Sequence, residues 1–506
     1  MPRHRGPTVT AAAPTHAEPY PRRWLALAVI AVTVLMIVLD ATIVNIALPA
    51  VSVDLDVSEA NQQWIVTAYT LTFGGFLLLG GRIADFWGRK RTYLVGAVGF
   101  ALASALGGLA QNEAMLFAAR ALQGTFGALL GPASLALITV LFTDATERSK
   151  AFAVYGAIAG GGSAVGLLLG GVLTEYADWR WCFWVNVPIA VLAVVFAWRI
   201  VPESRASGET SYDVPGAVLV TLGLASLVYG FTKVAEAAQA DGGGSPWGDG
   251  TALTFILIGV ALLVVFVVVE FRVRNPLLPM RLVLDRNRGG AYLTATLVGA
   301  GLIGSFFFLS LYFQQVLGYT PVTAGFASLP VTVGVLIAAG SASQLVPRIG
   351  PKPLMVAGGL FAAVGLFTLS FLGLDTPFWQ VALPGQVLLG LGLGFTFVPL
   401  SNLALVGVGE HDAGAASAVL QAVQQVGASI GTALLATFSV TAITNALQDR
   451  PPTPEDPTAA LVAQIDGYTT AFTWGAGFLL VAAVASAVLI KASKDDLPSE
   501  MAVHAG

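Results

Sequence analysis

Hydrophobic residues along the chain gather in long runs that are separated by shorter polar segments. Most runs are close to the roughly 20 residues that an α-helix needs to cross the apolar core of a bilayer. Many of them contain glycine, which membrane helices tolerate and use for close packing. We therefore predict fourteen transmembrane helices. They cover residues 24–48, 62–81, 92–110, 114–141, 151–173, 181–201, 214–235, 251–271, 290–315, 323–346, 353–373, 379–405, 414–443 and 470–490.

The positions of the basic residues support this number of helices. If the N-terminus is cytoplasmic, 21 of the 25 Lys and Arg residues fall on the cytoplasmic side. The exceptions are Arg180, Lys233 and Arg450 on the other side and Arg120 within a helix. Cytoplasmic loops of membrane proteins are enriched in Lys and Arg, and a wrong number of helices would scramble this alternation. We therefore expect both ends of the chain to be cytoplasmic.

Composition leads to the same class of protein. Of the 506 residues, 56% are hydrophobic and 11% are charged, whereas a soluble domain carries about 25% charged residues. The Pro-rich, basic residues 1–23 are expected to form a disordered tail. A cleaved signal peptide is the alternative interpretation of the hydrophobic run that follows, but that run is long and many similar runs come after it.

Several function classes are disfavoured by residues that the sequence lacks. Its single cysteine, Cys182, excludes an internal disulfide framework, and its four histidines show no metal-ligand spacing. Because no lysine directly follows a glycine, there is no phosphate-binding loop for ATP. There is also no long basic run of the kind that binds nucleic acid. We expect no enzymatic activity, no cofactor and no ATP or nucleic-acid partner.

Two loops share a short pattern, in which a glycine is followed two residues later by a lysine. The pairs are Gly88 with Lys90 and Gly350 with Lys352, and each loop joins the second and third helices of its half. Related halves with a cavity between them are typical of secondary transporters. We predict an all-α membrane protein with cytoplasmic tails at 1–23 and 492–506, six-helix bundles at 24–201 and 275–491, and two inserted helices within 202–274.

Two ionisable residues lie inside predicted helices, where charge is costly and usually functional. They are Asp40 in the first helix and Arg120 in the fourth. An aspartate can gain and lose a proton, whereas an arginine stays charged, so Asp40 is the candidate proton carrier and Arg120 its partner. In the alternative interpretation, Asp40 is a capping or packing acid near a helix end at Pro49, and Arg120 ties helices together through backbone carbonyls.

Polar and aromatic residues within other helices are candidates for a substrate cavity. Arg120, Gln123, Gly124 and Gly127 share one face of a helix by their spacing. Glutamines can line a pathway or merely tie helices together, and aromatic side chains can line a cavity or face lipid. The candidate cavity residues are Asn45, Trp64, Tyr69, Gln123, Phe306, Tyr312 and Gln424.

Glycines stand out in the fifth helix and in the loop between the second and third helices. Gly162, Gly166, Gly170 and Gly171 allow another helix to approach closely, and they are also candidates for a seam that bends or slides. In the loop, glycines permit a tight turn, an acid can pair with a nearby arginine, and basic residues hold the turn in the cytoplasm. We expect this loop to gate transport, or simply to fix topology. Its candidate residues are Gly81, Asp85, Gly88, Arg89, Lys90 and Arg91.

Six stretches carry a resemblance to a known family. Gly81–Arg91 resembles the signature loop of the major facilitator superfamily, and Leu116–Gly124 resembles its motif in the fourth helix. The other four are similar to motifs of its fourteen-helix drug:proton antiporter branch. They are Leu39–Pro49, Trp179–Pro188, Tyr312–Tyr319 and Ala413–Ser417.

The resemblance covers residues 24 to about 490 and implies the major facilitator fold. It also implies export of hydrophobic, often cationic, drugs in exchange for protons in a bacterial inner membrane. Asp40 and Arg120 would then serve proton coupling, and Asp85 with Arg89 would serve gating. One position departs from the pattern, because Leu167 stands where the antiporter motif of the fifth helix has proline. Without it, the helix loses a fixed kink.

We therefore predict a proton-coupled exporter that works by alternating access, with small hydrophobic or cationic substrates, protons and the lipid bilayer as partners. Two alternatives remain open. The chain exports one endogenous metabolite, such as an antibiotic, a siderophore or a lipid precursor, or it is a membrane scaffold or sensor that does not transport. Charges within the membrane argue against a scaffold, which has no use for them.

Overall fold

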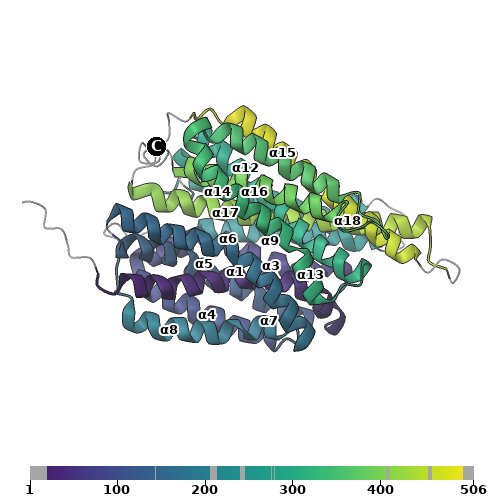
Figure 1. The fold of residues 1–506 in the computed structure, drawn as a ribbon, viewed down its shortest axis with the longest axis horizontal. Helices are drawn as coiled ribbons and strands as arrows, with labels where there is room; N and C mark the ends of the chain where they lie inside the picture. Colours follow the sequence, from purple (N-terminus) through teal and green to yellow (C-terminus); the bar gives the residue numbers. More distant parts are fainter. Residues whose placement is uncertain are drawn as a thin grey trace, which may run out of the picture.

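The computed structural model describes residues 20–142, 144–205, 213–239, 246–274, 276–278, 280–405, 410–453 and 458–493. Its elements are helices that run side by side along the molecule (Figure 1). The predicted tails at 1–23 and 492–506 fall almost entirely outside the described residues.

The N-terminal half consists of α1 (Arg23–Asp54), α2 (Glu59–Gln62), α3 (Trp64–Trp87), α4 (Arg89–Gly108), α5 (Glu113–Leu141), α6 (Ala145–Tyr176), α7 (Trp181–Trp184) and α8 (Asn186–Ile200). The insert consists of α9 (Val214–Gln239), the short 3₁₀ turn η1 (Pro246–Gly248) and α10 (Gly250–Glu270). The C-terminal half consists of α11 (Met280–Val283), α12 (Arg286–Leu311), the π-helical turn η2 (Tyr312–Val316), α13 (Pro321–Ala327), α14 (Leu329–Ile349), α15 (Pro351–Leu369), α16 (Ala382–Leu405), α17 (Glu410–Asp449) and α18 (Ala459–Leu489).

Each of the fourteen predicted spans corresponds to one long helix, in four cases extended by a short one. Twelve of these are long and apolar enough to cross a membrane. The other two, α4 and α6, have 20 and 32 residues and reach the same length. The prediction of an all-helical, multi-pass membrane protein is confirmed. Large apolar side chains on the outer helices are widely exposed, as with Leu257 at 66%, which suits a lipid-facing surface.

The two halves form two layers, and the inserted helix α9 lies against both. Figure 1 shows the N-terminal half, in purple and blue, beside the C-terminal half, in green and yellow. Helices α9 and α10 pack on each other, and α9 also contacts α3 and α17 where these two helices join the halves. The insert is therefore part of the packed molecule.

In both loops with the shared Gly-x-Lys pattern, the glycine has a positive φ angle. Gly88 separates α3 from α4 and Gly350 separates α14 from α15, with φ angles of 125° and 83°. Positive φ angles are easily adopted by glycine, so the internal repeat in the sequence is a repeat of structure. Gly81, however, lies inside α3, where its backbone faces Pro132 of α5. The prediction that Gly81 belongs to the turn was therefore wrong, because α3 extends to Trp87.

The cores of the two halves are nearly separate at one end of the molecule and merge at the other. We call the end where α1 begins, and where most basic loops lie, the basic end, and the opposite end the far end. At the basic end, one core contains Ile30 and Leu141 of the N-terminal half, and another contains Tyr292 and Leu403 of the C-terminal half. At the far end, a single core joins α1 with α12, α15 and α18.

Hydrogen bonds between the halves also join them at the far end. We call these contacts, together with the shared core, the far-end seal. The Ser310 hydroxyl donates to the Asn45 carbonyl at 2.6 Å, and the Gln314 amide donates to the Ile46 carbonyl at 2.9 Å, which joins α12 and η2 to α1. The Val322 N–H donates to the Glu175 carboxylate at 2.9 Å, which joins α13 to α6. The structure is therefore closed at the far end.

Candidate functional site

Asp40 and Arg120 meet in the interior of the N-terminal half. The Arg120 guanidinium donates from Nη1 to Asp40 Oδ2 at 2.6 Å. The side chains are 0% and 1% exposed, respectively. Removing either charge from water is expensive, and a close partner of opposite charge offsets part of that cost. The sequence predicted Arg120 as the partner of Asp40, and in the structure the two side chains form a direct ion pair.

Neutral amides complete the surroundings of the carboxylate. Asp40 Oδ1 accepts from Gln123 Nε2 at 2.7 Å and from Asn186 Nδ2 at 2.9 Å. Gln123 also accepts from Arg120 at 2.9 Å and donates to the Ser104 hydroxyl at 2.7 Å. Since each carboxylate oxygen has a donor, Asp40 is fully satisfied as an ionised group.

Arg120 is held from two further sides. Its Nε donates to the Ile65 carbonyl of α3 at 2.8 Å, and its guanidinium lies 4.5 Å from the centre of the Tyr69 ring. Phe183 of α7 lies on another side at 6.0 Å. An aromatic face attracts a cation, so Tyr69, a predicted cavity residue, covers the arginine.

The alternative interpretations of these two residues have different outcomes. Helix α1 continues past Pro49 to Asp54, and Asp40 is paired in its interior, so the interpretation of Asp40 as a capping acid near the helix end was wrong. Arg120 does tie helices together through the Ile65 carbonyl, so its structural alternative holds in addition to the ion pair.

The remaining predicted cavity residues are dispersed over both halves. Asn45 is buried beside α12, and its Oδ1 has no hydrogen-bond partner. Tyr312 is buried and donates to the Gly373 carbonyl at 2.8 Å. Trp64, Phe306 and Gln424 are half-buried, with Trp64 packed beside α9 and α17. The assignment of these residues to a substrate cavity stays a prediction.

The glycines of α6 lie where other helices come close. A Cβ at Gly162 would meet Val38 at 3.0 Å, and one at Gly170 would meet the Ile43 carbonyl at 2.8 Å; Gly166 likewise contacts α1. A Cβ at Gly171 would instead meet Pro321 O, in the other half, at 2.7 Å. Helix α6 runs without interruption through Leu167, the position where proline was expected. The stripe thus packs α6 on α1 and reaches the far-end seal.

The predicted gating loop makes its contacts mainly within itself, with α8 and with the segment that directly follows α8. Arg89 donates to Asp85 at 2.9 Å across the turn at Gly88. The Lys90 N–H donates to Glu203 at 3.2 Å, and the Arg91 side chain lies 3.7 Å from the same carboxylate. Arg82 reaches the start of the C-terminal half, because it donates to the Pro276 carbonyl at 3.4 Å. In the described part of the chain, the loop is therefore held mainly by α8 and the segment after it, and its role in gating stays a prediction.

Three site residues were missed by sequence analysis. Asn186 lies in the Trp179–Pro188 stretch, where an amide at the start of a hydrophobic run was a usable signal. Ser104 and Glu203 carried no comparable signal, because a serine in a helix and a glutamate in a loop are common.

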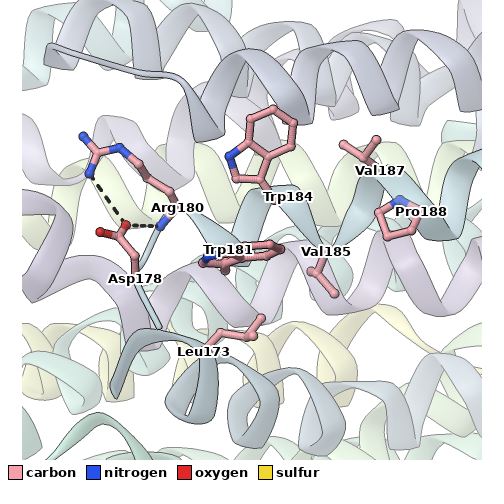
Figure 2. A pocket seen from close by; sticks show the side chains of 8 residues that line it. All are labelled: Leu173, Asp178, Arg180, Trp181, Trp184, Val185, Val187 and Pro188. Carbon is pink, nitrogen blue, oxygen red and sulfur yellow. Dashed lines mark hydrogen bonds and ion pairs between the residues drawn. The ribbon is translucent and has the colours of Figure 1, made fainter. Parts of the chain in front are cut away.

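Figure 2 shows a surface hollow whose lining includes neither Asp40 nor Arg120. It is lined by the end of α6, by α7 and by the start of α8, and its Trp181 is 53% exposed. The same short helix α7 directs Phe183 inward toward Arg120. The hollow is therefore an outer feature of the helix that supports the buried site.

Comparisons with known proteins identify several exporters as relatives. The chain is 48% identical to the puromycin resistance protein pur8 of Streptomyces alboniger, over 93% of this chain and 92% of that protein. It is 37% identical to the cephamycin export protein CmcT of Amycolatopsis lactamdurans, over 80% and 82% of the two chains. It is 36% identical to the multidrug efflux pump LfrA of Mycolicibacterium smegmatis, over 82% and 81%.

Solved structures share the fold at low sequence identity. The D-xylose–proton symporter matches with a TM-score of 0.62 at 16% identity, over 94% of this chain and 99% of that one. A bacterial homologue of the lysosomal transporter Spinster matches with a TM-score of 0.62 at 14% identity, over 95% and 99%. The family model of the Major Facilitator Superfamily matches residues 30–432, and the chain therefore belongs to this superfamily of transporters.

Proposed function

We propose that this chain exports small hydrophobic or cationic compounds, antibiotics among them, across a bacterial inner membrane in exchange for protons. The relatives named for antibiotic resistance, antibiotic export and multidrug efflux support the substrate class and direction. The observation that carries the coupling to protons is the fully buried Asp40–Arg120 pair. Ionisable groups at this depth are expensive, and in transporters they form proton relays.

A proton on Asp40 would remove the attraction that holds Arg120 at Oδ2. Arg120 would keep its bonds to the Ile65 carbonyl and to Gln123, so it would stay with α3 and α5 while α1 becomes free to shift. Because α1 also carries Asn45 and Ile46 of the far-end seal, its movement would weaken the contacts with α12 and η2. Protonation and opening of the far end are thus linked through one helix.

The basic end would face the cytoplasm, with both chain termini, because Lys and Arg are retained there. The far-end seal would then close the protein toward the outside. Substrate would enter between the halves from the cytoplasm, and rocking of the two bundles would release it on the other side. Asp85 and Arg89 would gate this movement at the turn beside Gly88, and the glycines of α6 would form its sliding seam.

The proton gradient supplies enough energy for useful export. One charge moving through 100 mV contributes about 2.3 kcal/mol, and about 1.4 kcal/mol corresponds to a tenfold gradient. One proton exchanged for one neutral molecule would therefore sustain roughly a 50-fold substrate gradient.

The test is substrate efflux by proteoliposomes with and without an imposed pH gradient. Asp40→Asn should abolish acceleration by the gradient while the protein still inserts and folds, because Asn keeps the shape of the side chain but binds no proton. The matched control is Asp375→Asn, which changes an acid in a loop outside the site. Gradient-driven efflux by Asp40→Asn at the wild-type rate would remove Asp40 from the coupling role.

A dedicated exporter of one endogenous compound is the second candidate, because pur8 and CmcT are each named for a single antibiotic. Expression in an efflux-deficient host separates the two. Protection against many unrelated compounds supports multidrug export, and protection against one structural class supports the dedicated exporter. A purified protein that moves no compound in proteoliposomes would favour the scaffold or sensor.

A further inference from the structure

Two carboxyl groups meet at the basic end of the inserted helices. Asp213 directly precedes α9, and Glu270 is the last residue of α10. Their residues are 4% and 2% exposed. Both acids are therefore almost as completely removed from water as Asp40, although they lie in a different part of the molecule.

Each carboxyl group uses one oxygen to hold backbone. Asp213 Oδ1 accepts from the Gly216 N–H at 2.9 Å and so caps the first turn of α9. Glu270 Oε2 accepts from the Leu278 N–H at 2.8 Å and so holds the segment that leads into the C-terminal half. Both acids therefore have defined positions.

The other two oxygens are buried and have no donor. They are Asp213 Oδ2 and Glu270 Oε1. Both face the same small space, because a Cβ built on Gly216 would lie 2.5 Å from the first and 2.7 Å from the second. Glycine at 216 leaves this space free, and the two unpaired oxygens face each other across it.

Two ionised carboxylates offer only acceptors to each other, so their contact is repulsive and leaves both oxygens unsatisfied. A single proton turns one of them into a donor and removes one of the two charges. From α3, Arg82 brings a positive charge to the segment that Glu270 holds. Its described hydrogen bond goes to the Pro276 carbonyl at 3.4 Å and not to either acid.

We propose that Asp213 and Glu270 form a proton-binding site in which the two carboxyl groups share one proton. The proton fastens the inserted helix pair to residues 276–278 at the entrance of the C-terminal half. A metal ion fits this place poorly, because hard cations such as Ca²⁺ take about six to eight oxygen ligands, and only two free oxygens meet here.

Loss of this proton would leave two buried negative charges beside Arg82. The guanidinium would then be drawn from Pro276 toward the acids, which would loosen the contact between α3 and the segment at 276–278. Since the pair lies at the basic end, it would respond to pH on that side. The inference does not rest on proton-coupled export, because it concerns residues outside the Asp40 network.

The first measurement is infrared difference spectroscopy of the purified full chain during a pH titration. A shared proton gives a protonated-carboxyl band that persists to neutral pH. The band should remain in Asp40→Asn and disappear in both Glu270→Gln and Asp213→Asn. The matched control is Glu236→Gln, which changes a partly exposed acid near the other end of α9. A band that is absent from the wild-type protein, or unchanged in both variants, would overturn the proposal.

The second measurement is the dependence of thermal stability on pH. The folded protein holds a proton that the unfolded chain releases at lower pH, so stability should fall by a few degrees as pH rises through that window. Glu270→Gln should abolish this slope, because its amide donates permanently, and Glu236→Gln should retain it. An equal slope in wild-type and Glu270→Gln would contradict the site.

Addition of Na⁺, Mg²⁺ or Ca²⁺ tests the identity of the ligand. None should change the melting temperature of the wild-type protein more than that of Glu270→Gln. Selective stabilisation of the wild type by one of these ions would show a cation site and overturn the proton. Efflux assays report separately on Asp40, so failure of proton-coupled export leaves these measurements unaffected.

Discussion

The two six-helix halves have related architecture but different interiors. The N-terminal half buries a carboxylate and a guanidinium, Asp40 and Arg120. In the described residues of the C-terminal half, the buried polar side chains are all uncharged. They are Thr294, Ser305, Ser310, Ser328, Thr332, Gln386, Thr396, Ser429, Thr432, Thr437, Ser439 and Ser486.

The hydrogen bonds of these groups also differ in reach. Several buried hydroxyls of the C-terminal half donate to a carbonyl one turn earlier in the same helix, as Thr294 does to Gly290 and Thr396 does to Gly392. The Asp40 network instead joins α1, α3, α4, α5 and α8. In the described residues, the N-terminal half therefore holds a buried ion pair that ties several helices together, whereas the C-terminal half has no buried ion pair.

The most severe test of this difference is Arg120→Ala. It leaves the Asp40 carboxylate buried without a cation, and breaking a buried pair in this way costs about 3–5 kcal/mol. We expect a large fall in the thermal stability of the purified protein, measured by unfolding in detergent.

A double variant separates the loss of a partner from the loss of the pair. In Asp40→Leu/Arg120→Met both charges are replaced by apolar side chains, which is often neutral for stability. The double variant should recover most of the stability that Arg120→Ala loses, although gradient-driven efflux stays absent. If it is as unstable as Arg120→Ala, the fold depends on the network itself and not on charge balance.

The second test compares two buried amides, one from each half. Asn186 donates to the charged Asp40 at 2.9 Å, whereas Gln386 donates to the neutral Ala327 carbonyl at 2.9 Å. Hydrogen bonds to charged groups contribute about 1.5–3 kcal/mol, and neutral ones about 0.5–1.5 kcal/mol. Asn186→Ala should therefore destabilise the protein more than Gln386→Ala in the same unfolding assay. Equal losses would mean that the charge at Asp40 adds nothing to the interior of the N-terminal half.

The helices were predictable from the sequence because a membrane span is defined by its length and its hydrophobicity. Both can be read directly from the order of residues in the chain. Their ends were harder. The polar residues Arg82 and Asp85 suggested that the second span ends at residue 81, but α3 continues to Trp87. Its last turns lie at the basic end, where charged side chains do not oppose a helix.

The centre of the site was predictable for the same reason, since Asp40 and Arg120 are the conspicuous charges in hydrophobic runs. Their neutral partners were not predictable. Asn186 contacts Asp40 and Ser104 contacts Gln123 only because α4, α5 and α8 pack together in the fold. The Asp213–Glu270 pair escaped notice for a related reason. Both acids lie at helix ends, where sequence alone suggests contact with water.

The third test concerns the far-end seal between the halves. Gly171→Val places a side chain against α13, because a Cβ at this position would lie 2.7 Å from the Pro321 carbonyl oxygen and 2.8 Å from Val322 Cα. Overpacking costs about 1–3 kcal/mol, enough to shift a conformational equilibrium about 5- to 150-fold. A cysteine introduced at Ser310, which is buried in the seal, should then react faster with a membrane-impermeant maleimide.

Gly162→Val is the matched control for this test. It also enlarges a glycine of α6, but the added atoms meet Val38 within the same half. Labelling at Ser310→Cys should therefore stay near the wild-type rate. The native Cys182 is buried and contributes little background. Equal acceleration by both variants would mean that α6 loosens as a whole and that Gly171 has no special place in the seal.

The smallest effect is expected at the basic end, where the gating loop is tied to the segment that directly follows α8. Glu203 lies 3.7 Å from Arg91 with both side chains partly exposed, and such pairs contribute about 0.2–1 kcal/mol. Glu203→Gln should therefore change stability only slightly, and less in high salt because exposed charges are screened.

Asp85→Asn, which removes the contact with Arg89 at 2.9 Å, should be equally mild for stability but should slow efflux if the turn gates transport. Glu203 and Asp85 both contact the turn at Gly88. If Glu203→Gln slows efflux as much as Asp85→Asn does, gating depends on the rigidity of the turn. If only Asp85→Asn slows efflux, gating depends on the Asp85–Arg89 pair.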